Sequence, residues 1–120
     1  MSPKVVPMIH VPDVRATADW YKTIGFSAPR FYEEDGQMLW ALLTFGESEV
    51  MLNCGGKPSN AERREFDLYV NTNNVDELHA RLKDGVDVVE PPHDTFYGMR
   101  EFIIRDFNRF WITFGEPKKS

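Results

Sequence analysis

An internal repeat in the order of the predicted elements constrains the fold of this chain most strongly. In the first half, a short apolar run over residues 3–11 leads into a helical pattern, and three strand-like runs follow. The same order recurs after a polar stretch over residues 55–64, which contains Gly, Pro and Asn and predicts a linker. Each half therefore predicts one β-α-β-β-β unit. The sequence indicates a single domain over residues 1–120, with pseudo-repeats at 3–54 and 65–115.

Hydrophobic spacing places one helix in each half. The first helical stripe, between the capping residue Asp13 and Gly25, consists of Val14, Ala18, Tyr21 and Ile24. The second stripe, which ends before Gly85, consists of Val75, Leu78 and Leu82. The strands that follow the helices are expected over residues 28–33, 38–45, 49–54, 65–71, 86–89, 99–105 and 109–114. Residues 91–94 have no regular pattern and predict a loop in a position to act as a lid.

Alternation along the strands predicts two chemically distinct sheet faces, because successive strand side chains point to opposite sides. The apolar set, expected to pack against the helices, is Val5, Ile9, Val11, Val50, Leu52, Phe66, Leu68, Val70, Phe110, Ile112 and Phe114. The mixed set is Val6, Met8, His10, Glu49, Met51, Asn53, Glu65, Asp67, Tyr69, Arg109, Trp111 and Thr113, and matching residues 38–45 to 99–105 adds Trp40. We call the side that carries the mixed set the open face.

Composition narrows the classes of partner. The net charge of −5 argues against nucleic acid and anionic membranes, both of which an acidic surface repels. The single cysteine, Cys54, rules out an internal disulfide and a Cys-rich metal cluster. The N-terminal residues lack a signal-peptide layout, and no apolar stretch reaches the length of a membrane span. A cytoplasmic protein is therefore expected.

Several short segments resemble the vicinal oxygen chelate superfamily, which includes glyoxalase I, extradiol dioxygenases, fosfomycin-resistance proteins and bleomycin-binding proteins. The similar segments are VPMIHVPDV at residues 6–14, Trp20-Tyr21, Gly25-Phe26, YGMREF at residues 97–102 and RDFN at residues 105–108. The resemblance covers nearly the whole chain and is nearest to the bleomycin-resistance-like branch. It implies an α+β fold in which two βαβββ units form a curved mixed-sheet cup with the helices on the convex face.

Enzymes of this superfamily hold a divalent metal in the cup through His and Glu side chains. The resemblance places the four ligand positions at Val6, Met51, Glu65 and Thr113. Only Glu65 is a strong ligand type, whereas zinc, iron or nickel sites need at least three nitrogen, oxygen or thiolate ligands. We therefore expect no metal and no other cofactor, and we do not expect glyoxalase or dioxygenase chemistry.

The open face suits a small-molecule ligand. The expected binding residues are Met8, His10, Trp40, Met51, Glu65, Asp67, Tyr69, Arg109 and Trp111. Aromatic rings stack on flat ligands, and carboxylates near them attract a cation, so the expected ligand is cationic and aromatic. Together with the resemblance, this predicts sequestration of a bleomycin-type antibiotic by a homodimer, with no bond made or broken.

Two alternatives stay open at the level of sequence. One is a metal-independent isomerase or lyase that acts through His10 or Glu65. The other is a non-catalytic interaction or regulatory domain whose open face is a dimer interface or is filled by its own side chains. Arg109 is expected to pair with Glu65 or Asp67, whereas the charged run at residues 62–64 is expected to be ordinary solvated surface.

Overall fold

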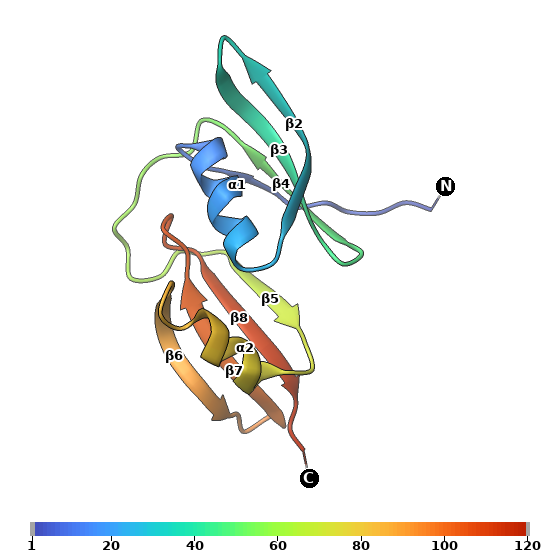
Figure 1. The fold of residues 1–120 in the computed structure, drawn as a ribbon, viewed down its shortest axis with the longest axis vertical. Coiled ribbons are helices and arrows are strands. Elements are labelled where there is room, and N and C mark those ends of the chain that lie inside the picture. Colours follow the sequence, from blue (N-terminus) through green and yellow to red (C-terminus); the bar gives the residue numbers. More distant parts are fainter. Residues whose placement is uncertain (1, 120) are drawn as a thin grey trace. The chain divides into compact units, whose positions relative to one another are not determined.

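The computed structural model describes residues 2–119, which form two compact units that divide after Pro58. Each unit contains one of the two predicted repeats. In both units a strand and a helix are followed by three further strands, which confirms the predicted α+β class built from two βαβββ units (Figure 1). None of the helices in the described residues is long and apolar enough to cross a lipid bilayer.

The first unit forms a four-stranded mixed sheet with one helix. Its elements are β1 (Met8–His10), α1 (Val14–Thr23), β2 (Ser27–Glu34), β3 (Gln37–Phe45) and β4 (Ser48–Asn53). The strand order is β1-β4-β3-β2, with β1 parallel to β4 and the other pairs antiparallel. Ile9, Val50 and Leu52 are buried in the core, as alternation predicts, and Ala41 is buried beside them. Val5, however, precedes β1 and is 92% exposed, so its assignment to the core was wrong.

The second unit repeats this arrangement. Its elements are β5 (Asp67–Asn71), α2 (Val75–Leu82), β6 (Asp87–Asp94), β7 (Met99–Arg105) and β8 (Trp111–Pro117). The strand order is β5-β8-β7-β6, and β5 runs parallel to β8. Phe102, Ile104, Ile112 and Phe114 are fully buried, and α2 packs against β6, β7 and β8. The residues that alternate with them along the strands, such as Glu101 and Ile103, therefore belong to the open face.

The two helices are capped in different ways. The Asp13 side chain accepts a hydrogen bond from the Ala16 N–H at 3.0 Å, which is an ordinary local N-cap. Asn74, at the same position before α2, makes no such bond. Instead, the buried Glu116 of β8 accepts the Val75 N–H at 3.0 Å. The start of α2 therefore depends on a contact between residues far apart in sequence.

The structure corrects three strand predictions. Residues 91–94 were predicted to be an irregular loop, but they continue β6 to Asp94. β6 is an edge strand with register shifts near Glu90, so two prolines without an N–H are tolerated there. β5 starts at Asp67 and leaves Glu65 in a bend, and β8 starts at Trp111 and leaves Arg109 in a turn at φ 76°.

Candidate functional site

The open face of the second unit carries a hollow of about 600 Å³. Residues of β5, β6, β7 and β8 line it, together with the turn between β6 and β7 and with Arg63. Three residues predicted from the sequence meet there, namely Asp67, Tyr69 and Trp111. Because this hollow brings together aromatic rings and carboxylates, it is the candidate functional site.

A buried carboxylate lies in the wall of the hollow. Glu101 is only 3% exposed. The Tyr69 hydroxyl donates to its Oε2 atom at 2.7 Å, and the Tyr97 hydroxyl lies 2.8 Å from both carboxylate oxygens. Within residues 2–119, no Lys, Arg or His side chain forms an ion pair with this carboxylate. Glu101 is thus an anionic group held only by neutral donors.

The two phenols remain hydrogen-bond donors over a wide pH range. Burial, and then the hydrogen bond to Glu101, raise the pKa of Tyr69 well above its ordinary value of 10.0. The hydrogen bond to Glu101, and then burial, raise the pKa of Tyr97. Both shifts follow from the cost of forming a phenolate where water is partly excluded and a carboxylate lies beside it. At neutral pH both hydroxyls are therefore protonated and point at Glu101.

Gly115 makes the Tyr69–Glu101 contact possible. Gly115 of β8 is paired with Asn71 of β5 on one side and with Glu101 of β7 on the other. A Cβ atom at this position would lie 2.1 Å from the Tyr69 hydroxyl oxygen. The tyrosine ring can cross β8 toward β7 only because residue 115 has no side chain. Sequence alternation places Glu101 and Gly115 on the open face, but our sequence interpretation did not identify them or Tyr97 as site residues.

Trp111 is already partly covered. The Arg63 guanidinium lies 4.1 Å from the centre of its ring and forms an ion pair with Asp67, while the indole N–H donates to the Glu62 carbonyl at 3.1 Å. Arg64 lies over the Phe110 ring at 4.4 Å and donates to the Asn108 carbonyl. Glu62 and Arg63 are exposed, as predicted for a solvated charge run, but Arg64 is half-buried and both arginines cover aromatic rings. Arg63 also leaves one face of Trp111 less accessible to a ligand.

The predicted partner of Arg109 was also wrong. Its Nε atom donates to the Ala61 carbonyl at 2.7 Å, and Arg63 takes the place beside Asp67. Glu65 is exposed in the bend before β5 and does not line the hollow. His93, which we predicted in a lid loop, is on β6, where its ring contacts the Pro91 carbonyl at 2.9 Å and Glu90 at 3.3 Å.

The remaining predicted residues share the open face of the first unit. Met8 is paired with Met51, and Asn53 is paired with both His10 and Trp40, so these side chains are neighbours across β1, β4 and β3. The Asn53 amide lies 3.6 Å from the Met8 sulfur. Glu49 forms an ion pair with Lys4 and not with His10. This face is rich in sulfur and aromatic groups and has little buried charge.

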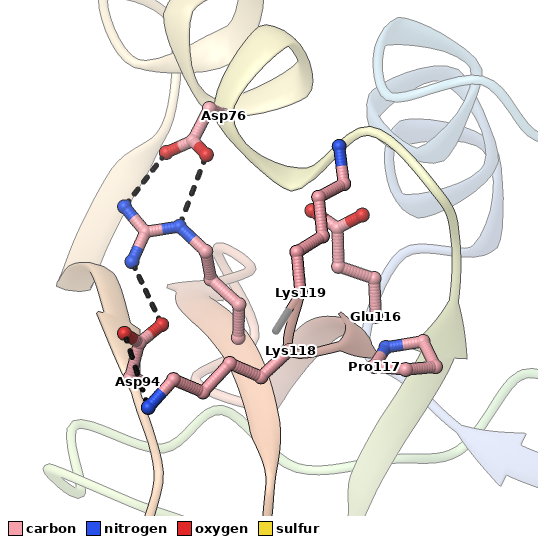
Figure 2. A pocket seen from close by; sticks show the side chains of 7 residues that line it. Asp76, Asp94, Glu116, Pro117, Lys118 and Lys119 are labelled. Carbon is pink, nitrogen blue, oxygen red and sulfur yellow. Dashed lines mark hydrogen bonds and ion pairs between the residues drawn. The ribbon is translucent and has the colours of Figure 1, made fainter.

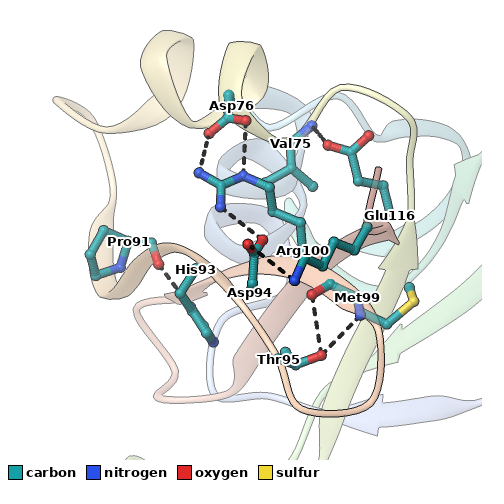
Figure 3. Close-up of polar contacts among 10 residues, drawn as sticks. Val75, Asp76, Pro91, His93, Asp94, Thr95, Met99, Arg100 and Glu116 are labelled. Atoms are coloured by element: carbon teal, nitrogen blue, oxygen red, sulfur yellow. Dashed lines mark hydrogen bonds and ion pairs between the residues drawn. The ribbon is translucent and has the colours of Figure 1, made fainter. Parts of the chain in front are cut away.

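A second, smaller hollow of about 270 Å³ contains an ion-pair cluster (Figure 2). The Arg100 guanidinium donates to both carboxylate oxygens of Asp76, at 3.0 and 2.9 Å, and to Asp94 at 3.0 Å. Hydrogen bonds from Arg100 lower the pKa of Asp76, and both carboxylates raise the pKa of Arg100. Figure 3 shows this cluster beside the Val75–Glu116 cap. These contacts join α2 to the sheet, so we assign the cluster a structural role.

The positions where the superfamily's enzymes hold a metal do not provide a suitable set of donors. Val6 has no ligand atom, Met51 offers a thioether, and Thr113 offers a buried neutral hydroxyl. Glu65 lies outside β5. Within residues 2–119, no three His, Cys, Asp or Glu side chains form a group that could hold a metal ion. The donor set of this chain therefore does not fit the family's metal.

Comparison with solved structures supports the fold. TioX from Micromonospora sp. ML1 is 24% identical with a TM-score of 0.78, over 97% of this chain and 99% of that chain. A bleomycin resistance determinant encoded on transposon Tn5 is 15% identical with a TM-score of 0.73, over 98% and 100%. A bleomycin-binding protein complexed with bleomycin is 13% identical with a TM-score of 0.71, over 98% and 100%.

Comparison by sequence gives a family and no individual relative. No curated protein matches the chain significantly. The family model described as Glyoxalase/Bleomycin resistance protein/Dioxygenase superfamily matches residues 5–114. This match covers nearly the whole chain and agrees with the two βαβββ units described above. The chain therefore belongs to the Glyoxalase/Bleomycin resistance protein/Dioxygenase superfamily.

Proposed function

We propose that this protein binds a small cationic and aromatic molecule without a metal, and that its specific function is sequestration of a bleomycin-type antibiotic. The observation that carries the proposal is the buried Glu101 carboxylate, which lines an aromatic hollow and has no ion pair among the described residues. A buried anion without a cationic partner is costly, and a bound cation compensates that cost.

The charges around the hollow also favour a positively charged ligand. Its lining includes Asp67, Glu90, Asp94 and Glu101. Asp67 is paired with Arg63, and Asp94 with Arg100 and Lys118. Among the described residues Glu90 is paired with His93, which is a cation only when protonated. The balance is negative, and it attracts a cationic ligand.

The aromatic groups supply a surface for a flat ligand. Tyr69, Phe96, Tyr97 and Trp111 all line the hollow. The exposed fraction of Phe96 is 99%, so its ring is fully available at the turn after β6. Rings of this kind contribute about 0.5–1.5 kcal/mol per stacked pair beyond the area that they bury. On the separate open face of the first unit, Trp40 is proposed to stack on a flat ligand, with Met8, His10 and Met51 beside it.

The proposal includes a homodimer, which the resemblance to bleomycin-binding proteins implies. Bleomycin is bound in one neighbour and a second neighbour confers resistance to it, which gives the drug as the first ligand to test. Light scattering at the concentration used for binding measures the mass of the particle. A monomeric mass would contradict the dimer but not ligand binding.

The test is calorimetric titration of bleomycin into chelator-treated protein. We expect metal-independent binding by the wild type and roughly tenfold weaker binding by Trp111→Ala, because a stacking surface is lost. Phe107→Ala is the matched control, since its ring is 49% exposed in the turn before β8 and does not line the hollow. Absence of heat from the wild type would reject the antibiotic. Equal weakening in Phe107→Ala would reject this face as its site.

A further inference from the structure

We propose that Glu101, with the hydroxyls of Tyr69 and Tyr97, is the receptor for an alkylammonium group of the ligand. This inference rests on the proposed function, because it takes the hollow as a small-molecule site, and it specifies the chemical group recognised there. The receptor is formed by β5, the turn after β6, and β7, with the carboxylate in the wall of the hollow.

The carboxylate has acceptor capacity left. An ionised carboxylate offers about four lone-pair sites, and each tyrosine hydroxyl has one proton to donate. Tyr69 and Tyr97 therefore use about half of the acceptor capacity of Glu101. The phenols supply hydrogen bonds but no charge, so the negative charge remains uncompensated in a residue that is 3% exposed. An ammonium group supplies up to three donors and the missing positive charge.

The geometry favours an ammonium over a guanidinium. A guanidinium binds a carboxylate best as a fork, with two parallel N–H donors on the two oxygen atoms. The Tyr97 hydroxyl already lies 2.8 Å from both Oε1 and Oε2, and thus occupies that edge of the carboxylate. A point-like ammonium needs only one free lone pair on one oxygen. The same oxygen can accept it beside the tyrosine proton.

The neighbouring rings indicate what the ammonium is attached to. Phe96 and Tyr97 lie edge to face, with ring centres 5.0 Å apart and planes at 85°. Their turn is held by Thr95, whose N–H and hydroxyl both donate to the Met99 carbonyl. An exposed aromatic pair next to a buried anion suits an ammonium joined by a short linker to an apolar or aromatic body.

The glycine at position 115 supports the assignment of the receptor, because the Tyr69–Glu101 contact requires a residue without a side chain there. Its backbone does not adopt a positive φ, so the glycine is not required by the backbone conformation. What it provides is space, because any Cβ would collide with the Tyr69 hydroxyl. Gly115, which is paired with Glu101, is thus the residue type that lets the Tyr69 hydroxyl reach the carboxylate in addition to Tyr97.

The test compares 2-phenylethylammonium with its neutral analogue 2-phenylethanol, each titrated into the full chain and followed by ¹H–¹⁵N NMR. The two probes share a ring and a linker, so a difference in affinity reports the ammonium group, with its charge and its additional N–H donors. We expect the wild type to bind the ammonium at least about tenfold more tightly, as for a hydrogen bond between charged groups. Equal affinity for the two probes, or no shift with the ammonium at its solubility limit, would overturn the proposal without any variant.

The Glu101→Gln variant tests whether Glu101 causes the preference for the ammonium probe over the alcohol. The amide keeps an acceptor oxygen for the tyrosines but loses the charge, so the preference for the ammonium should disappear. Glu116→Gln is the matched control, because this glutamate is also buried and also on the sheet but caps α2. It should keep the preference. A preference retained in Glu101→Gln, or lost in Glu116→Gln alone, would contradict the assignment.

Bleomycin separates this inference from the proposed function. If bleomycin binds the wild type and Glu101→Gln equally well, antibiotic binding stands and the ammonium receptor is wrong. If bleomycin does not bind but the ammonium preference depends on Glu101, the receptor stands and the antibiotic is wrong.

Discussion

The two repeats share a strand order and a register, but the equivalent positions on their open faces carry different chemistry. In the first unit, one row across the sheet is His10, Asn53, Trp40 and Tyr32. In the second unit, the row in the same register is Asn71, Gly115, Glu101 and His93. By the same register, Met8 corresponds to Tyr69. The fold has thus kept the positions while the side chains have diverged.

The divergence gives the two open faces different chemistry. The trio Met8, Asn53 and Trp40 includes an amide 3.6 Å from a thioether sulfur, next to an indole. The equivalent trio Tyr69, Gly115 and Glu101 is a phenol that crosses a glycine to reach a buried carboxylate. One face offers apolar and polarisable surface, and the other offers a fixed charge.

The largest expected effect in this comparison comes from Gly115→Ala. The new methyl group collides with the Tyr69 hydroxyl and leaves Glu101 short of a donor, so we expect a loss of about 3 kcal/mol in unfolding free energy. The equivalent Asn53→Ala removes only its hydrogen bonds to Met8 and the Cys54 N–H, and should cost less than about 1 kcal/mol. Urea unfolding of both variants measures the difference. Equal losses would mean that the glycine has no special role.

An intermediate effect is expected at the helix caps. Glu116→Ala removes a buried carboxylate that caps α2, and we expect a loss of about 2 kcal/mol. Asp13→Ala removes the local cap of α1 and should cost about 1 kcal/mol. Hydrogen exchange should show faster exchange in the first turn of α2 only in Glu116→Ala. Faster exchange at α2 in Asp13→Ala would show that the two caps are not independent.

The smallest expected effect is on the stability of the protein against unfolding at alkaline pH. Because the folded state raises the pKa of Tyr69 and Tyr97, both phenols stabilise the protein fully below their ordinary pKa of 10.0. This contribution is lost as the pH rises above 10.0 towards the higher folded values. Met8, the equivalent of Tyr69, does not titrate. Urea midpoints at about pH 8 and about pH 11 should therefore differ less in Tyr69→Phe than in the wild type. An unchanged difference would exclude Tyr69 as a source of the pH dependence.

Much of the fold was predictable because its signals are local. The stripe of Val14, Ala18 and Tyr21 and the cap Asp13 lie within a few turns of chain, and β7 over Met99–Arg105 matches the predicted run. The error at residues 91–94 has the opposite origin. Two prolines argue against a strand in general, but they are compatible with an edge strand, and only the strand order shows that β6 lies at an edge.

The candidate site was predictable only in part. Alternation placed Asp67, Tyr69 and Trp111 on one face, and the structure brings them to one hollow. The partners of these residues depend on contacts across long stretches of sequence. Arg63 lies over Trp111 across 48 residues, and Glu101 meets Tyr69 across 32 residues. The sequence suggested Glu65 or Asp67 as the partner of Arg109, but the turn that contains Arg109 directs its side chain to the Ala61 carbonyl.

By itself, the sequence determined the repeat, the two helices and the division of each sheet into an apolar and an open face, because periodicity is a property of neighbouring residues. The tertiary structure alone decided that Glu101 is buried with no ion pair among residues 2–119, that Gly115 leaves room for a phenol, and that Glu116 caps a distant helix. These outcomes depend on strand register. Register places residues opposite one another across a sheet, and a shift of one residue would place every one of these side chains on the other face.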